Sequence, residues 1–206
     1  MTNKQLLVLA TQNVGKIKEI RELLRDFPVE IKSLADFRPL PDIEEDGTTF
    51  YENAYKKASF TARFLGVPAM ADDSGLVVEA LGGAPGILSA RYAGPAATDD
   101  DNNQKLLRAM EGKTNRAASF VCVISIAVPS GMAFTYEGRC RGLIAQSPAG
   151  ERGFGYDPLF YYPPLRKTFA QLSREEKNRV SHRGKALAQL KSEFEKVLTW
   201  IRRACR

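Results

Sequence analysis

The sequence predicts an α/β fold built on a long mixed β-sheet with flanking helices, and three observations support this. Between residues 5 and 71, strand-like apolar runs alternate with amphipathic helical segments, which is typical of strands joined by helices. Residues 117–128 and 132–144 then have the pattern of two long strands joined by a Pro-Ser-Gly turn, which predicts a hairpin. There is no internal repeat and no clear linker, so we expect a single domain over residues 1–206, with two lobes about a cleft as an open alternative.

The first half is justified element by element. Residues 5–10 are almost continuously apolar and predict a buried strand. The helix that follows places apolar residues such as Ile17 and Ile20 on one face. Thr49 with Glu52 three residues later is a capping box, which predicts a helix start. The expected elements are a strand at 5–10, a helix at 16–26, a strand at 29–32, a helix from about 49 to 64 and a strand at 67–71.

The second half begins with a Gly- and Pro-rich segment, residues 81–96, which predicts a loop. Thr98 or Asp99 caps a further helix that ends near residue 112. The strand hairpin follows, and residues 150–164 then form an aromatic, glycine-rich loop or short strand. Ser173 and Glu176 make another capping box, and the last helix presents one apolar stripe for core packing.

Composition excludes several classes of protein. The 206 residues are 44% hydrophobic and 26% charged, which suits a globular chain with a sizeable core. No apolar stretch approaches the roughly 18 residues that cross a bilayer, and the first apolar run is too short for a signal peptide, so we expect a cytoplasmic protein with no membrane partner. The three cysteines form no CxxC pair, which argues against a disulfide framework or a zinc site.

The positive charge lies near the C-terminus, since residues 166–206 carry a net +8 and the rest of the chain −2. Such an excess attracts nucleic acid or a small polyphosphate, although a solvated helix face explains it as well. A nucleic-acid-binding module is therefore one open interpretation.

Two segments suggest phosphate and metal binding. The sequence ATQNVGK, residues 10–16, lies where a strand turns into a helix, so backbone N–H groups and Lys16 could bind an anion. An ordinary strand–turn–helix in which Asn13 caps the helix is the plain alternative. Residues 44–46 are three consecutive acids ahead of a helix; they suit a hard cation, or simply compensate the helix dipole. Asn53 could reach back toward the same space.

The most informative stretch is Asp72-Asp73-Ser74-Gly75, placed at the end of an expected strand. Burying an unpaired carboxylate is costly, but a divalent cation would offset that cost. Successive strand residues point to opposite faces, so one aspartate could face a cleft while the other braces the loop. One aspartate and one loop glutamate would supply the one or two carboxylates that Mg²⁺ usually takes. An Asx turn is the alternative.

Two further segments suggest recognition of a planar base. In GFGYDPLF, residues 153–160, Phe154 and Tyr156 could stack on a base and Asp157 could accept hydrogen bonds from it, although aromatic residues more often fill cores. In EEKNRVSHRGKA, residues 175–186, Ser181 is expected to cap the last helix. His182 and Arg183 would then lie at its first turn, an unfavourable place for cations unless an anion or polar ligand docks there.

Together these stretches resemble one family closely, the inosine triphosphate pyrophosphatases that remove non-canonical purine nucleotides. The resemblance covers nearly the whole chain, in the family's order. The matching sequences are TQNVGK at 11–16, EEDGTTFYENAYKKA at 44–58, ADDSGLVVEALGGAPGILSARYAG at 71–94, RGFGYDPLF at 152–160 and REEKNRVSHRGKAL at 174–187.

The resemblance implies an elongated, two-lobed α/β fold with an active-site cleft between the lobes, and a homodimer. It implies Mg²⁺-dependent hydrolysis of dITP, ITP, XTP and dXTP to the monophosphate and pyrophosphate, with no stable nucleic-acid partner. A related pyrophosphatase with another base preference, such as modified pyrimidines, stays open.

The resemblance also implies roles by position. Asp73 is the general base and a metal ligand, and Glu44 or Glu45 supplies the second metal carboxylate. Gln12 departs mildly from the family pattern, where small residues are frequent, while its neighbours are kept. The implied substrate-binding residues are Thr11, Gln12, Asn13, Val14, Gly15, Lys16, Ser74, Phe154, Gly155, Tyr156, Asp157, Lys177, His182 and Arg183.

Overall fold

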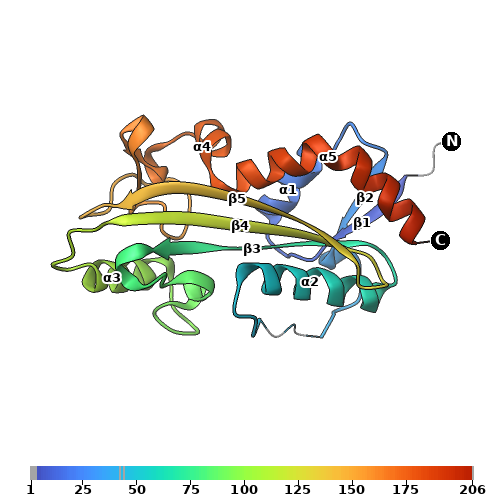
Figure 1. Ribbon diagram of the computed structural model, residues 1–206, viewed down its shortest axis with the longest axis horizontal. Coiled ribbons are helices and arrows are strands. Elements are labelled where there is room, and N and C mark those ends of the chain that lie inside the picture. Colours follow the sequence, from blue (N-terminus) through green and yellow to red (C-terminus); the bar gives the residue numbers. More distant parts are fainter. Residues whose placement is uncertain (1–3, 42, 44, 206) are drawn as a thin grey trace. The chain divides into compact units, whose positions relative to one another are not determined.

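The structure is a computed structural model that describes residues 4–41, 43 and 45–205. Over this part of the chain the strands form a seven-stranded sheet in the order β2-β1-β3-β4-β5-β6-β7 (Figure 1). Strand β1 is parallel to β2 and β3, while β6 is antiparallel to β5 and β7, so the sheet is mixed as predicted. The strands are β1 (Gln5–Leu9), β2 (Val29–Ser33), β3 (Ala69–Val78), β4 (Ala117–Ala127), β5 (Ala133–Ile144), β6 (Phe160–Tyr162) and β7 (Lys167–Thr168).

The helices begin close to the residues that the capping signals predict. Thr49, Thr98 and Ser173 are N-caps whose hydroxyls accept N–H groups in the first turn. The first helix differs, because Asn13 caps it and it starts two residues earlier than expected. The α-helices are α1 (Val14–Leu23), α2 (Phe50–Leu65), α3 (Asp99–Ala109), α4 (Arg174–Val180) and α5 (His182–Ala204). None of the helices in the described ranges is long and apolar enough to cross a membrane.

The chain separates into two compact units. Unit 1 comprises Met1–Asp73, Val123–Glu137 and Ala186–Arg206, and unit 2 comprises Ser74–Cys122 and Gly138–Lys185. Strands β3, β4 and β5 each contribute residues to both units along their length. The mixed α/β fold is as predicted, whereas the two lobes, the elongated shape and the cleft stay predictions.

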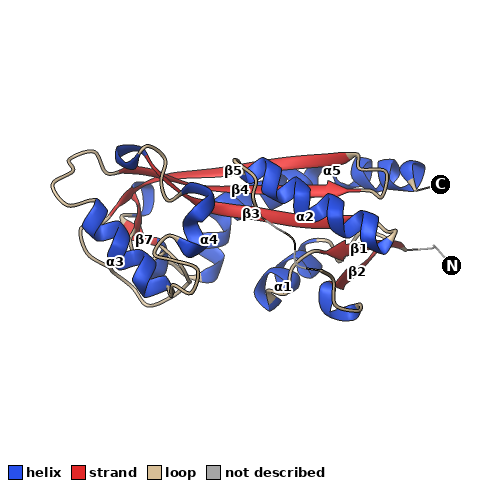
Figure 2. Cartoon of the chain, turned by 90° about the horizontal axis from the view of Figure 1, so that it is seen from below, coloured by secondary structure: helices blue, strands red, loops and turns tan. Residues whose placement is uncertain are grey.

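In unit 1, helices α2 and α5 lie on opposite faces of the sheet (Figures 1 and 2). Small side chains let α2 approach the strands closely, since Ala58 and Ala62 pack with Val8 and Ala69. The predicted stripe of α5 is buried, including Leu190, Phe194 and Ile201. The hairpin turn is also as expected, because Val128 and Gly131 close it with backbone hydrogen bonds. These contacts fix the strand ends and helix starts from which the unit 1 site residues project.

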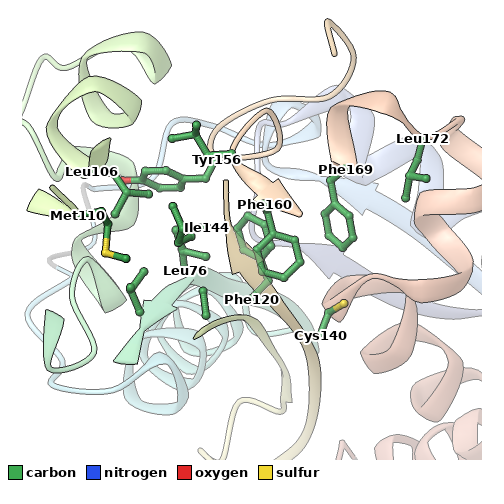
Figure 3. Close-up of a cluster of buried hydrophobic side chains, with 13 residues drawn as sticks. Leu76, Leu106, Met110, Phe120, Cys140, Ile144, Tyr156, Phe160, Phe169 and Leu172 are labelled. Atoms are coloured by element: carbon green, nitrogen blue, oxygen red, sulfur yellow. The ribbon is translucent and has the colours of Figure 1, made fainter. Parts of the chain in front are cut away.

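Unit 2 has its own core of aromatic and aliphatic side chains (Figure 3). Phe120 lies 4.6 Å from Phe160 and 5.8 Å from Phe169, measured between ring centroids. Leu106 and Met110 bring helix α3 into the same cluster. The glycine-rich segment 153–157 therefore leaves and re-enters a packed core.

One strand is longer than predicted. The third strand was expected to end at the Asp pair, but β3 continues through Asp72 and Asp73 to Val78. Leu76 and Val78 are buried beyond the pair, so the strand has a hydrophobic reason to continue. The carboxylates therefore lie within the strand, where an Asx turn is excluded and neighbouring side chains point to opposite faces.

Candidate functional site

The first group of predicted residues surrounds the junction between β1 and α1 in unit 1. The Asn13 side chain accepts the Lys16 N–H at 3.1 Å, and the Thr11 hydroxyl accepts the Asn13 N–H at 3.2 Å. Asn13 has ordinary extended angles and Gly15 lies within the helix, so the turn is made without unusual backbone at these two positions. Val14 is exposed at the helix start. The junction is a capped helix N-terminus, which suits an anion.

The two adjacent aspartates have different lysine partners, as the opposite faces of a strand require. The Lys16 ammonium lies 2.8 Å from Asp72 Oδ1 and 2.9 Å from its Oδ2. Lys16 was expected to serve as a point charge for phosphate, and here that charge is held at the strand by Asp72. This carboxylate therefore fixes where the ammonium lies.

Asp73 forms the second pair, with a lysine from α2. Lys57 Nζ lies 3.1 Å from Asp73 Oδ1 and 3.2 Å from Glu45 Oε1, so one ammonium joins two carboxylates. The second oxygen, Asp73 Oδ2, is buried and has no partner in full hydrogen-bond geometry among the described residues, although the nearby Asn53 side chain helps to lower the pKa of this carboxyl. Burial raises the pKa of Asp73, against the opposing effect of Lys57. Burial works to lower the pKa of Lys57, but Asp73 and Glu45 outweigh it and the pKa is raised.

These residues fit a magnesium ion. No group of three or more His, Cys, Asp or Glu side chains suited to a metal occurs within the described ranges. Mg²⁺ needs fewer, because it takes one or two carboxylates and completes its shell with water and phosphate oxygens. A buried carboxylate oxygen without a donor, beside a second carboxylate on the same lysine, meets that need. Glu44, the other predicted ligand, lies outside the described residues.

Two side chains of helix α2 contact the acidic loop and the strand that carry these carboxylates. Asn53 accepts the Gly47 N–H at 2.9 Å through Oδ1, so it does reach back to the acidic loop as predicted. Its Nδ2 is buried without a hydrogen bond from the described residues. Asn53 and Lys57 are four residues apart and share one face of the helix. The two side chains thus tie the loop and the strand to α2.

In unit 2, the predicted base-binding loop presents one aromatic ring. The Phe154 side chain is 59% exposed. Lys177 Nζ lies 4.6 Å from the centre of its ring and the Arg183 guanidinium 6.0 Å from it. An exposed ring near two cations can stack on a nucleobase, and the cations can attract negative phosphates.

Tyr156 does not lie beside Phe154 as a second stacking ring. It is only 4% exposed, its hydroxyl donates to the Ser89 carbonyl at 2.8 Å, and it packs in the unit 2 core (Figure 3). Burial raises the pKa of this phenol well above its ordinary value. The prediction that Tyr156 stacks on a base is therefore wrong, because its ring is buried in the unit 2 core and its hydroxyl is bonded there.

Asp157 is an anchor of this loop. Its Oδ2 accepts the Phe154 N–H at 2.9 Å and forms a short ion pair with Lys177. Burial raises the pKa of Asp157, with Lys177 opposing. Gly153 has φ +82°, and a Cβ there would meet Asp157 Oδ2 at 2.0 Å, so only glycine permits this approach. The carboxylate expected to accept from a base is thus already engaged within the loop.

His182 and Arg183 begin α5, and Ser181 caps it, as predicted. The Ser181 hydroxyl accepts the Gly184 N–H at 3.1 Å. The His182 ring is buried and stacks on Phe120 with centroids 4.7 Å apart. His182 therefore has a packing role in addition to any contact with a substrate.

Ser74, another predicted substrate-binding residue, is the first residue of unit 2 and is half-buried in β3.

Comparisons with known proteins identify the family of this chain. The sequence pattern of the Ham1 family matches residues 7–193. The chain belongs to the Ham1 family. It is 61% identical over 196 residues to a protein of Syntrophobacter fumaroxidans named dITP/XTP pyrophosphatase, covering 95% of this chain and 84% of that one. A Desulfotalea psychrophila protein of the same name is 60% identical, over 95% of this chain and 88% of that one.

A solved structure is similar throughout. The Ham1 protein from Coxiella burnetii has a TM-score of 0.90 and 46% identity, over 93% of this chain and 99% of that chain. The Ham1 fold assignment thus rests on both sequence and structure.

Sequence reasoning missed one residue of this Ham1 protein's carboxylate group. Lys57 carries the only described ammonium that contacts both Asp73 and Glu45. The available signal was its spacing, since it follows Asn53 by four residues on the same helix face. Its partner on the strand is 16 residues away in sequence, so no local pattern indicates the pair.

Proposed function

We propose that this protein hydrolyses dITP, ITP, XTP and dXTP to the nucleoside monophosphate and pyrophosphate, as a dITP/XTP pyrophosphatase. Family membership supports the reaction class, and the names of the relatives support the substrates. The single observation that carries the chemistry is the buried Asp73 oxygen that accepts no hydrogen bond from the described residues. Such an oxygen is available to a cation or to a reacting water.

We assign the phosphate chemistry to residues of unit 1. Asp73 and Glu45 would hold Mg²⁺, with Glu44 as the alternative second ligand. The ion would neutralise charge on the phosphates and thereby assist departure of pyrophosphate. Asp73 orients the attacking water and takes its proton, while the oxygen bonds to the α-phosphorus and the bond to pyrophosphate breaks. The capped N-terminus of α1, residues 11–16, and the Lys16 ammonium bind the triphosphate.

We assign base recognition to residues of unit 2. Phe154 stacks on the base, and Lys177 and Arg183 lie against its ring. Selectivity for a 6-oxo purine requires donors aimed at O6, because adenine presents N–H groups there. The N–H groups of Phe154 and Gly155 are already bonded to carboxylates. This leaves His182 and Arg183 as our candidates, and His182→Ala should change the ratio of ITP to ATP hydrolysis; an unchanged ratio would remove His182 from this role.

The remaining properties follow the same proposal. We infer that the two units act as one catalytic domain, that the protein is a homodimer, and that it works on the cytoplasmic nucleotide pool without a membrane or stable nucleic-acid partner. Sedimentation and salt-dependent retention on DNA are direct tests of the dimer and of the absent nucleic-acid partner.

The deciding experiment measures pyrophosphate release from ITP, XTP, dITP, GTP, ATP and dTTP, with and without Mg²⁺. We expect Mg²⁺-dependent release from ITP, XTP and dITP, weak release from ATP, and loss in Asp73→Asn. Asp26→Asn, an exposed carboxylate of the same unit, is the matched control and should retain full activity. Release from no nucleotide, or full activity in Asp73→Asn, would overturn the proposal.

A further inference from the structure

Two side chains of helix α3 form hydrogen bonds with the backbone N–H and carbonyl of Gly155. The Gly155 N–H donates to Asp99 Oδ2 at 2.6 Å, and the Asn103 Nδ2 donates to the Gly155 carbonyl at 2.9 Å. The two side chains are four residues apart, so they project from the same face of α3. Both hydrogen-bonding groups of one residue are thereby tied to one helix.

This contact lies directly beside the exposed ring of Phe154. Gly155 has φ +59°, a left-handed conformation that glycine adopts without strain. The Asp99 bond is charge-assisted, and Asn103 is 8% exposed, so water competes little for its bond. Because the Phe154 ring is mostly exposed, packing does little to fix its direction. Its direction depends more on the loop backbone, which Asp157 holds at the Phe154 N–H and α3 holds at Gly155.

Helix α3 is itself fixed in unit 2, so it can hold Gly155 in place; we call the Asp99 and Asn103 hydrogen bonds to Gly155 the clamp. Leu106 and Met110 bury α3 in the unit 2 core. Asn102, next to Asn103, accepts the Ala93 N–H at 2.7 Å and donates to the Ala90 carbonyl at 3.2 Å. The helix is therefore fixed by its apolar face and by a second loop, independently of Gly155.

We propose that Asp99 and Asn103 are positioning residues that set the orientation of Phe154 for stacking on the purine of the substrate. This inference rests on the proposed function. The two side chains act through the Gly155 peptide, so removing them should weaken substrate binding while leaving the phosphate chemistry of unit 1 intact. A purely structural role would lower stability and activity without a selective effect on KM.

The test compares Asp99→Ala and Asn103→Ala with Asp100→Ala. Asp100 occupies the same first turn, and its side chain accepts from Gln104 of α3, so it controls for the helix dipole. We expect KM for ITP to rise about tenfold in both test variants, with kcat within about threefold of wild type. Asp99→Asn keeps an acceptor and should restore most of the affinity. Asp99 is exposed, so its variant should fold even if Asn103→Ala does not.

Two further measurements separate the clamp from the function. In a Phe154→Ala background, Asp99→Ala should raise KM no further, because the ring on which the clamp acts is gone. Hydrogen exchange of residues 153–157 should accelerate about tenfold in Asp99→Ala and not in Asp100→Ala. If wild type hydrolyses no nucleotide while exchange responds as expected, the proposed function fails and the clamp stands. Unchanged exchange, or equal KM in Asp99→Ala and Asp100→Ala, overturns the inference.

Discussion

Two aspartates, the half-buried Asp73 in unit 1 and the buried Asp157 in unit 2, are each paired with a lysine from a helix, yet their surroundings differ. Asp157 accepts an N–H of its own loop as well as the Lys177 ammonium. Asp73 keeps a buried oxygen that accepts nothing from the described residues. Burial raises the pKa of both carboxyls.

The difference distinguishes Asp157, whose carboxylate is engaged by its own loop and α4, from Asp73, to which we assign the chemistry. Buried charge is costly, and the cost is offset only when hydrogen bonds satisfy the remaining lone pairs. The engagement of Asp157 by Phe154 and Lys177 ties one end of a loop to α4. Asp73 is less well satisfied by protein groups, which is expected where a cation or reacting water completes the site. The comparison therefore predicts opposite responses to mutation.

The largest expected effect is on stability in unit 2. Asp157→Ala leaves the largely buried Lys177 without its carboxylate and should lower the free energy of unfolding by about 3 kcal/mol. Urea unfolding monitored by circular dichroism measures this. Asp73→Asn, measured alongside, should cost less than about 1 kcal/mol, since Lys57 keeps Glu45 as a partner and the amide removes a desolvated charge. Equal losses in the two variants would contradict the comparison.

The next effect is on turnover in unit 1. Lys57→Met removes the ammonium between Asp73 and Glu45, so both carboxylates lose their shared partner, and kcat for ITP should fall about 100-fold. The control is Lys56→Met, an adjacent lysine whose partner is the exposed Asp46. Steady-state kinetics that show similar kcat for the two variants would remove Lys57 from the catalytic group.

A smaller effect distinguishes the two aromatic residues of the unit 2 loop, beginning with the exposed one. Phe154→Ala should raise KM for ITP about tenfold with little change in kcat, because a stacked base contributes on the order of 1–3 kcal/mol. Initial rates over a range of ITP concentrations measure this. An unchanged KM would mean that Phe154 does not contact the base.

The smallest effect concerns the buried aromatic residue. Tyr156→Phe removes only the hydrogen bond to the Ser89 carbonyl, so unfolding should become easier by about 1 kcal/mol while KM stays the same. Thermal unfolding and the same rate assay give both values. A raised KM with unchanged stability would return Tyr156 to the substrate site.

Much of the fold was predictable because its signals are local. Thr49, Thr98 and Ser173 each predict a helix start from a pattern that spans only four residues. The turn sequence from Pro129 to Gly131 predicts the hairpin in the same local way. Apolar runs likewise located the strands of unit 1. The five longest strands of the sheet were among these predicted elements, whereas β7 was not.

What escaped prediction depends on contacts between distant residues. Strand β3 continues through two aspartates because Lys16 and Lys57, from helices earlier in the chain, neutralise them. No sequence pattern reports that pairing. For the same reason the sequence does not distinguish Tyr156 from Phe154, although only Tyr156 is buried in the core. The site residues were recognisable from the sequence, but the structure was needed to show that Asp157 holds the loop while Phe154 stays exposed.

The most direct test of the central contrast measures kcat at saturating ITP for Asp73→Asn and Asp157→Asn in the same assay. The Asp157 variant should recover most of the wild-type rate once ITP is saturating, because its loss lies in binding. The Asp73 variant should stay at least about 100-fold below wild type at every ITP concentration, because its loss lies in the chemical step. Recovery of the Asp73 variant at high ITP, or an equal loss of kcat in the Asp157 variant, would contradict this account.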